Sequence, residues 1–214
     1  MTMLTYTIDS GNTFVKIGVF KGSTLEEVHR IKSEDFKFQF KDDSSIIYSN
    51  VSKDISNSIP DHAICASRLI KNFKTAYDKD RLGLDRKIIS HYLQNQQSAN
   101  TLLIDAGSFI TFDEIRDGIH YGGPIYLGLV NYLRAYPTFS QNLPLIDPNN
   151  LGQDSSTKQA INKAFDDYLK MITGEIKKYS SYNIVITGGD AHYFAPFGEI
   201  DDNLMHKALF SLQD

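Results

Sequence analysis

The sequence predicts a mixed α/β fold made of two similar lobes, and two observations carry this prediction. A short apolar strand that ends in Asp-x-Gly opens the chain, and the same pattern returns about halfway along it. Thr5-x-x-Ile8-Asp9-x-Gly11 is matched by Thr101-x-x-Ile104-Asp105-x-Gly107. Residues 94–100, just before the second copy, are polar and carry no apolar period, which is typical of a boundary. We therefore expect an N-terminal lobe over residues 1–97 and a C-terminal lobe over residues 98–214.

Strands dominate the expected first lobe. Apolar residues alternate along residues 14–20, which is the period of a strand, and a shorter strand over residues 4–8 precedes them. The polar residues 9–13 form a tight turn between the two. The remaining expected elements are strands over 28–32 and 46–51, a loop over 33–45, and helices over 63–73 and 84–93.

The second lobe is expected to continue with a second β-like run after Gly107 and then a long helix. Residues 156–172 place their apolar side chains on one helical face: Ile161, Ala164, Phe165, Tyr168, Leu169 and Ile172. An apolar strand then runs from Asn183 into the turn Thr187-Gly-Gly-Asp190.

Composition excludes several classes of function. The 214 residues are 41% hydrophobic and 22% charged, which is ordinary for a globular protein. The net charge is −4 and no block of like charges occurs, so we expect no nucleic-acid partner and no membrane partner. No apolar run is long enough to span a bilayer, and the N-terminus is too short and too soon acidic for a signal peptide. The single Cys65 cannot form an internal disulfide and is expected to be a small buried residue, which fits a reducing cytoplasm.

The two Asp-x-Gly turns have the chemistry of a phosphate site. Glycine after a strand lets backbone N–H groups approach a ligand, and consecutive N–H groups form a nest for phosphate oxygens. Side-chain donors are also present: Asn12, Thr13, Ser108 and Thr111. Carboxylates that could position a cation beside the phosphates are Asp9, Asp105 and Asp113. Two facing turns of this kind would clamp a nucleotide phosphate chain and its metal, and Gly188 and Gly189 would let the backbone pass close to a nucleoside.

Each motif also has a plain structural interpretation. A single Asp-x-Gly after a strand is an ordinary turn, and only its repetition favours nucleotide binding. Phosphate-loop, dinucleotide and nucleophile-elbow motifs are absent, and the histidines lack metal-ligand spacing; His91 is expected at the surface or at a helix cap. Leu82-Gly-Leu-Asp-Arg86 opens a helix, where it could supply a base and an anion holder or only a salt bridge at a helix start.

Taken in order, these motifs resemble those of the type III pantothenate kinases. The resemblance rests on Asp9–Thr13, Gly83–Arg86, Asp105–Asp113, Gly122–Gly128, Leu143-Pro144, Thr157 and Thr187–Gly189. The chain departs from the family pattern at three places. Ser108-Phe109 stands for Thr-Ala, Leu127 stands for a proline, and the spacing between Tyr77 and Gly83 is shortened.

The resemblance implies two actin-like lobes of the sugar-kinase and heat-shock-ATPase superfamily, with the active site in the cleft between them. It implies ATP-dependent phosphorylation of pantothenate to 4′-phosphopantothenate, the first step of coenzyme A biosynthesis. It further implies Mg²⁺ with ATP, a monovalent cation (K⁺ or NH₄⁺), and a homodimer. The aromatic stretch Tyr121–Phe139 also suits an interface, although a core helix is an equal interpretation.

The resemblance also implies the site residues. Asp85 would be the proton acceptor and Asp105 the ligand of the monovalent cation. ATP and its phosphates would be bound by Asp9, Ser10, Gly11, Asn12, Thr13, Phe14, Val15, Lys16 and Ser108. Pantothenate would be bound by Tyr77, Gly83, Leu84, Asp85, Arg86 and Thr157. The alternatives are another small-molecule kinase of this fold, acting on a sugar or acetate, and a non-catalytic nucleotide-binding regulator; the intact Gly-x-Asp-Arg favours an enzyme.

Overall fold

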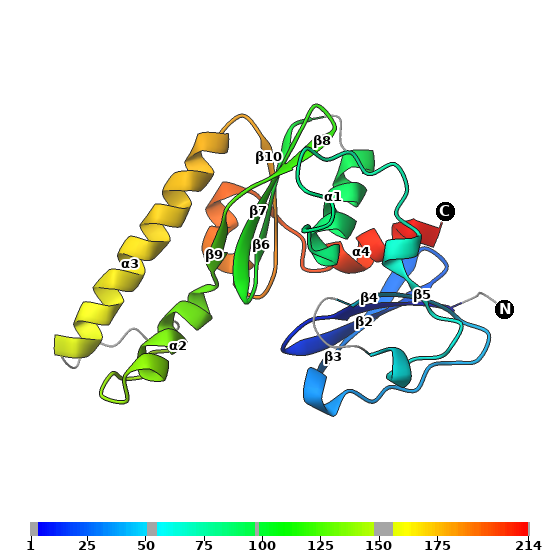
Figure 1. Cartoon of the computed structure of the whole chain (residues 1–214), viewed down its shortest axis with the longest axis horizontal. Coiled ribbons are helices and arrows are strands. Elements are labelled where there is room, and N and C mark those ends of the chain that lie inside the picture. Colours follow the sequence, from blue (N-terminus) through cyan, green and yellow to red (C-terminus); the bar gives the residue numbers. More distant parts are fainter. Residues whose placement is uncertain (1–3, 51–54, 97–98, 148–155, 214) are drawn as a thin grey trace. The chain divides into compact units, whose positions relative to one another are not determined.

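The computed structural model describes residues 4–50, 55–96, 99–147 and 156–213, which form two compact units. The first unit comprises residues 1–96 and 203–214, and the second comprises residues 97–202. Figure 1 shows both units, with labels on most of their helices and strands. Residues 203–214, which the sequence prediction places in the C-terminal lobe, belong to the first unit because the last helix packs on β1 and α1 of that unit.

The first unit is built on a five-stranded sheet with the order β3-β2-β1-β4-β5. Its strands are β1 (Leu4–Ser10), β2 (Phe14–Lys21), β3 (Thr24–Lys32), β4 (Ser45–Asn50) and β5 (Ile64–Cys65). Its helices are α1 (Leu84–Gln96), α4 (Leu204–Phe210) and short 3₁₀ turns at Ser33–Asp35, Ser56–Ser58, Ala66–Arg68 and Ser211–Gln213.

The second unit is built on a six-stranded sheet with the order β11-β10-β6-β7-β8, in which β9 also pairs with β7. Its strands are β6 (Thr101–Ala106), β7 (Phe109–Arg116), β8 (Ile119–Gly122), β9 (Ile125–Leu127), β10 (Asn183–Thr187) and β11 (Glu199–Ile200). Its helices are α2 (Leu129–Phe139), α3 (Ser156–Ile176) and 3₁₀ segments at Lys177–Tyr179 and Ala191–Phe197.

The two sheets share one topology. In the first, β1 is antiparallel to β2 and parallel to β4, and β4 is parallel to β5. In the second, β6 is antiparallel to β7 and parallel to β10, and β10 is parallel to β11. The Asp-x-Gly turns that repeat in the sequence join equivalent strands, β1 to β2 and β6 to β7. The predicted mixed α/β fold with two similar lobes is therefore confirmed.

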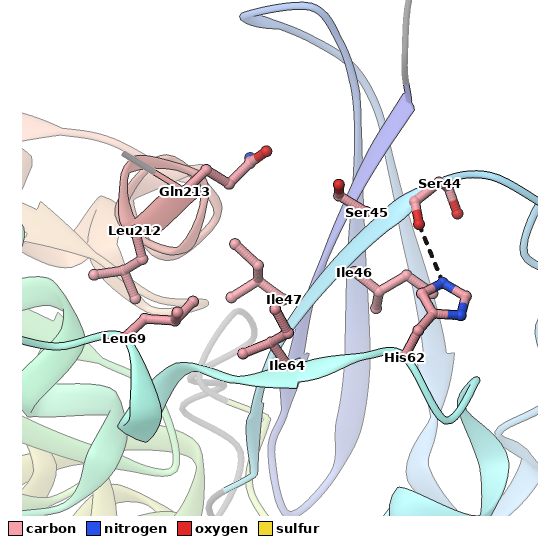
Figure 2. A pocket seen from close by; sticks show the side chains of 9 residues that line it. All are labelled: Ser44, Ser45, Ile46, Ile47, His62, Ile64, Leu69, Leu212 and Gln213. Atoms are coloured by element: carbon pink, nitrogen blue, oxygen red, sulfur yellow. Dashed lines mark hydrogen bonds between the residues drawn. The ribbon is translucent and has the colours of Figure 1, made fainter.

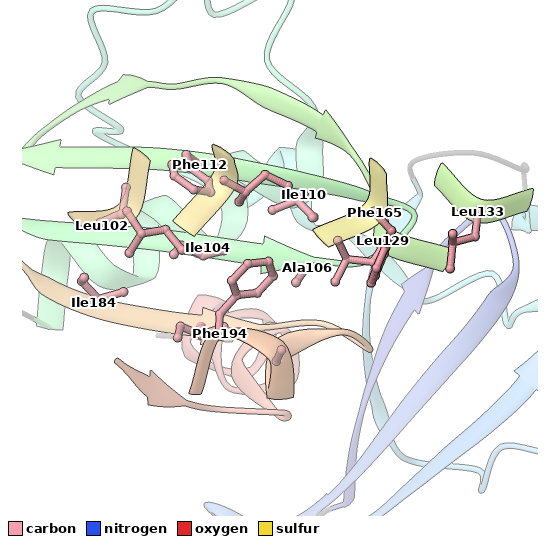
Figure 3. Packing of buried hydrophobic residues seen from close by; sticks show 14 of the residues in the cluster. Leu102, Ile104, Ala106, Ile110, Phe112, Leu129, Leu133, Phe165, Ile184 and Phe194 are labelled. Carbon is pink, nitrogen blue, oxygen red and sulfur yellow. The ribbon is translucent and has the colours of Figure 1, made fainter. Parts of the chain in front are cut away.

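Each unit has its own apolar core. The first core gathers Tyr6, Ile8, Val15, Ile17, Ile46 and Ile55. In the second, shown in Figure 3, Phe112, Phe165 and Phe194 are fully buried with the aliphatic residues of β6 and β7. The predicted apolar face of α3 lies in this core, where Ile161, Phe165 and Ile172 are buried. Burying each such side chain contributes about 1.5–3 kcal/mol.

Two local predictions are wrong, and two predicted strands are found with other bounds. Residues 63–73 form no long helix, because Ile64 and Cys65 pair in parallel with Ile47 and Tyr48 and a single 3₁₀ turn follows. Cys65 is only partly buried, and its Sγ lies 3.2 Å from Ser67 Oγ. The third strand begins at Thr24 rather than residue 28, because its whole length pairs with β2. The predicted strand 46–51 is found as Ser45–Asn50, and residue 51 lies outside the described residues.

Helices of the membrane-spanning kind are not found in the described parts of the chain, because none is both long and apolar enough to cross a bilayer.

A buried histidine joins the C-terminal helix to the first sheet. His206 of α4 is 2% exposed, and its Nδ1 lies 2.8 Å from Thr7 Oγ1 on β1. The ring is so close to β2 that a Cβ on Gly18 would lie 2.9 Å from it. Burial, aided by the charge of Lys16, lowers the pKa of His206 from 6.5 to about 4. The fold therefore holds the neutral ring.

We expect this histidine to make the first unit acid-sensitive. Between pH 6.5 and 4 the unfolded chain binds a proton that folded His206 refuses, so stability present above pH 6.5 is lost as the pH falls to 4. The lowered pKa corresponds to about 3 kcal/mol. Urea unfolding at pH 7.5, 6 and 5 should show a flatter pH dependence for His206→Gln than for the parent. His192→Gln, at an exposed histidine, should keep the parental dependence; equal slopes for all three proteins would contradict the assignment.

Candidate active site

The first Asp-x-Gly turn is a tight connection between β1 and β2. The Gly11 N–H donates to the Phe14 carbonyl at 3.0 Å, and Ser33 Oγ donates to the Gly11 carbonyl at 3.0 Å. Asn12 and Thr13 lie exposed at the tip. The tip therefore presents polar side chains and backbone on a braced loop, as a phosphate site requires.

Two acidic groups of the first unit influence each other near this turn. Asp9 lies opposite Lys16 in the β1–β2 ladder. Burial raises the pKa of Asp9 to about 6; Lys16 opposes the rise and the carboxylate of Asp85 adds to it. Asp9 and Asp85 therefore share one electrostatic environment. Among the other predicted ATP-binding residues, Ser10 and Val15 have fully buried side chains, so only their backbone groups are available to a ligand.

The Gly-x-Asp-Arg motif begins α1, as predicted. Asp85 lies in the first turn of the helix, and its Oδ1 accepts the Arg86 N–H at 2.9 Å. A Cβ on Gly83 would come within 2.6 Å of that same oxygen. Only a glycine at this position therefore leaves enough space for the Asp85 carboxylate. Arg86 is only 8% exposed, and its Cζ lies 5.7 Å from the centre of the Tyr77 ring. The structure thus brings Tyr77, Gly83, Asp85 and Arg86 together within the first unit.

His91 differs from its predicted position. It lies partly buried in the middle of α1, with its ring 6.3 Å from that of Phe73, and is neither a cap nor a surface residue. Burial lowers the pKa of His91, which favours the neutral ring.

The second Asp-x-Gly turn, in the second unit, is one residue shorter than the first. The Gly107 N–H donates to the Phe109 carbonyl at 2.9 Å, and Ser108 is exposed at the tip. The shorter turn changes the pairing, so that Asp105 lies opposite Thr111, whereas Asp9 lies opposite a lysine. Thr111 Oγ1 is buried and has no hydrogen-bond partner in the described residues. The residue opposite Asp105 is thus Thr111, which carries a hydroxyl group, whereas the residue opposite Asp9 is Lys16, which carries an ammonium group.

Two glycine motifs pack directly on this second turn. The Gly128 N–H donates to the Ser108 carbonyl at 3.0 Å, and a Cβ on Gly128 would lie 2.1 Å from the Gly107 carbonyl oxygen. Gly188 has a φ of 98°, and a Cβ there would lie 2.4 Å from the Ala106 carbonyl oxygen. A side chain at either glycine would displace the turn.

Sequence reasoning missed two polar residues beside this turn. Asn131 donates from Nδ2 to the Ser108 carbonyl at 2.9 Å, and Asp190 donates from its backbone N–H to the Ala106 carbonyl at 2.8 Å. The only signal for Asp190 was its place directly after Gly188-Gly189.

Asp113 does not have the predicted cation-binding geometry. It is 0% exposed, and its Oδ1 is hydrogen-bonded to the equally buried Nε2 of His120 at 2.6 Å. This pair braces β7 against β8 inside the second unit. A carboxylate so enclosed cannot reach a bound nucleotide.

Thr157 lies exposed in the first turn of α3, in the second unit, whereas the Tyr77 group belongs to the first. The cleft shared by the two lobes stays a prediction. In the described residues no group of three or more His, Cys, Asp or Glu could hold a metal ion.

Three tyrosines of the aromatic stretch before and within α2 pack against the core, whereas Tyr121 and Phe139 at its ends are exposed. Tyr126, Tyr132 and Tyr136 pack against the second core, and the Tyr132 ring stacks on Tyr168 with 4.3 Å between centroids. Burial is the largest cause that raises the pKa of Tyr132 to about 12. The core interpretation therefore holds for these three tyrosines.

A surface hollow of about 330 Å³ in the first unit lies away from the candidate site (Figure 2). Its lining residues are Ser44, Ser45, Ile46, Ile47, His62, Ile64, Leu69, Leu212 and Gln213. It opens at the amino end of β4, whereas Asp9 and Ser10 pair with Ser49 and Asn50 at the carboxyl end. Ligands of open α/β sheets bind at the carboxyl ends of the strands, so the hollow is not the phosphate site.

Comparison with known proteins identifies the family. A type III pantothenate kinase of Aquifex aeolicus is 25% identical over 222 residues, covering 96% of this chain and 95% of the relative. A Campylobacter jejuni structure described as a Baf family transcriptional activator has a TM-score of 0.70 at 24% identity, covering 97% of this chain and 96% of that one. A Listeria monocytogenes structure described as an N-acetylmannosamine kinase has a TM-score of 0.51 at 14% identity, covering 99% of each chain. These two likenesses concern the fold alone, and they agree with the predicted two-lobed α/β fold. The family model described as type III pantothenate kinase matches residues 5–178, and the chain therefore belongs to that family.

Proposed function

We infer that this chain transfers the γ-phosphoryl group of ATP to pantothenate, giving 4′-phosphopantothenate and ADP in the first step of coenzyme A biosynthesis. The observation that carries the inference is the start of α1, where the absence of a side chain at Gly83 gives the Asp85 carboxylate its space. Arg86 and Tyr77 lie beside it. A carboxylate flanked by a cation and an aromatic ring is suited to a small polar substrate that bears a hydroxyl and a carboxylate group.

In this proposal Asp85 orients the pantothenate hydroxyl and accepts its proton. The hydroxyl oxygen forms the new bond to the γ-phosphorus, the bond to the ADP oxygen breaks, and ADP leaves with that electron pair. Tyr77, Leu84, Arg86 and Thr157 hold pantothenate. Phosphate oxygens are held by the turn around Gly11 and by Ser108, and Mg²⁺ arriving with ATP neutralises part of the charge that develops on them.

Asp105 is proposed as the ligand of a monovalent cation, K⁺ or NH₄⁺. The residues fit such an ion, because one carboxylate and the unpaired Thr111 hydroxyl supply oxygen ligands with a single negative charge. When bound, the cation offsets the repulsion between the carboxylate and the phosphates. Lys16 provides the equivalent positive charge beside Asp9 in the first turn.

The proposal includes a cytoplasmic homodimer that binds neither nucleic acid nor membrane. The net charge of −4 gives no attraction to polyanions, and the single cysteine suits a reducing compartment. Exposed Phe109, Ile125 and Phe139 in the second unit offer apolar surface for a second copy. Light scattering at micromolar concentration reports the oligomeric state.

A coupled assay of ADP release tests the function. We expect ADP release with ATP, Mg²⁺ and K⁺ that depends on pantothenate, and none above background with N-acetylmannosamine or acetate in its place. Turnover with a sugar or acetate instead would identify another small-molecule kinase. ATP binding by calorimetry without turnover on any acceptor would identify a nucleotide-binding regulator.

A further inference from the structure

The backbone carbonyl groups of Ala106 and Ser108, on either side of Gly107, accept hydrogen bonds from distant parts of the second unit. The Ser108 carbonyl accepts two hydrogen bonds from the start of α2, one from the Gly128 N–H and one from Asn131 Nδ2. The Ala106 carbonyl accepts the N–H of Asp190, which follows β10. Three segments, the β6–β7 turn, the β9–α2 junction and the turn after β10, therefore meet at Ser108.

The side chain of Asp190 makes the remaining connection. Its carboxylate accepts hydrogen bonds from the backbone N–H groups of Leu129 and Val130, the first two residues of α2. The residue at the N-cap position is Gly128, which has no side chain that could accept these hydrogen bonds. Because the first N–H groups of a helix lack intrahelical partners and a negative charge is favoured there, Asp190 acts as the cap from another segment.

These contacts form a closed network that includes the backbone of Ser108, whose side chain is exposed. Asp190 holds Ala106 through its backbone and α2 through its carboxylate, and α2 holds Ser108 through Gly128 and Asn131. The N-terminus of α2 is thereby occupied by the protein's own carboxylate and is not free to receive a phosphate.

We propose that Asp190 is a positioning residue for ATP, because its contacts with α2 and Ala106 fix the turn that carries Ser108. The proposal rests on the proposed role of Ser108 in phosphate binding. Asp190 never touches the nucleotide in this scheme; it acts through the position of the turn. Its loss should therefore weaken the use of ATP and leave the binding of pantothenate unchanged.

The pH dependence offers a readout that a purely structural cap would not give. Burial raises the pKa of Asp190 above its ordinary value, although the N–H group of Val130, the charge of the neighbouring His192 and the N–H group of Leu129 oppose the rise. A protonated carboxyl group is a weaker acceptor, so the KM for ATP in the parent should rise as the pH falls through that raised pKa. Asp190→Asn cannot titrate and should lack the part of this rise that Asp190 causes, whereas the part caused by Asp9, whose pKa is raised to about 6, should remain.

The test compares matched variants in steady-state kinetics. Asp190→Ala should raise the KM for ATP about tenfold, which corresponds to ~1.4 kcal/mol, with the KM for pantothenate within twofold of the parent. Asp190→Asn keeps one acceptor oxygen and should recover part of the loss. Asn100→Ala is the control, because Asn100 Oδ1 also accepts a backbone N–H, that of Asp117 at 3.0 Å, at the other end of β6. It should lower the melting temperature without changing the KM for ATP.

The outcomes separate the two levels of the proposal. If Asp190→Ala lowers only the melting temperature while Ser108→Ala raises the KM for ATP, Asp190 is only a structural cap and the inference is overturned, but the proposed site stands. If Ser108→Ala leaves the KM for ATP unchanged, the proposed site fails and the inference fails with it. Should Asp190→Ala not fold, a KM profile of Asp190→Asn that follows the parental pH dependence overturns the inference.

Discussion

Asp85→Asn is expected to lower kcat by about 10²–10⁴-fold while ATP binding stays near that of the parent. The substitution keeps the shape of the side chain and removes the charge that accepts the pantothenate proton, and a general base usually contributes this much. Asp85 lies in the first turn of α1, where the amide oxygen of asparagine can still accept the Arg86 N–H that Asp85 Oδ1 accepts at 2.9 Å. The loss should therefore be one of chemistry and not of folding. Single-turnover kinetics, with ATP affinity measured by calorimetry, provides the measurement.

Asp80→Asn is the matched control for this prediction. Asp80 is an exposed carboxylate just before the same helix, and its replacement should leave kcat within twofold. If Asp85→Asn also retains turnover within a few-fold of the parent, Asp85 is not the base and its role is that of a charge at a helix start.

Gly83→Ala probes the same carboxylate without removing it. The new Cβ would lie 2.6 Å from Asp85 Oδ1, so the carboxylate must move and kcat should fall although every charged group remains. Gly174→Ala makes the same substitution inside α3, where no atom lies within 4 Å of the new Cβ, and it should stabilise the protein by about 1 kcal/mol with kcat unchanged. A kcat for Gly83→Ala equal to that of the parent would show that the position of Asp85 is not critical.

The repeated topology could be predicted from sequence because it depends on short-range pattern. A strand followed by Asp-x-Gly is recognisable in one window, and finding it twice was enough to predict two similar α/β lobes. The apolar face of α3 was predictable for the same reason, since its period of 3.6 residues is local. The start of α1 at Leu84 followed from the glycine and the charged residues before the apolar run.

The remaining features depend on contacts that no local pattern reports. Ile64 and Cys65 are a strand only because β4 offers them a parallel partner, and that partner outweighs the helical spacing of residues 63–73. Residues 203–214 belong to the first unit because His206 is hydrogen-bonded to Thr7, which is 199 residues earlier in the sequence. Asp190 caps α2 from beyond a long helix and a strand, so its role follows only from the fold. Asp113 matched a family motif but is enclosed by His120, which sequence spacing could not reveal.

Asp105→Asn is expected to raise the KM for ATP and to abolish activation by K⁺ together, with a loss of about 10²-fold in kcat/KM at saturating K⁺. Removing a direct ligand should cost at least the 10–100-fold typical of the groups that support metal ligands. Asp117→Asn, an exposed carboxylate in the β7–β8 turn, is the control in the same unit and should keep parental K⁺ activation. Titrating K⁺ into a sodium buffer at several ATP concentrations measures both effects. Full activity of the parent enzyme in sodium alone would contradict the prediction.

The two turns of this protein supply a second test of that cation site. Asp9 has Lys16 across its ladder, whereas Asp105 has Thr111. Thr111→Lys would place an ammonium group where the K⁺ or NH₄⁺ ion is proposed to lie, reproducing the arrangement of the first turn. We expect this variant to work in sodium buffer with little further activation by K⁺, since the charge next to the phosphates is then built into the chain. If Thr111→Lys stays folded and remains as dependent on K⁺ as the parent, the cation does not act between Asp105 and the phosphates.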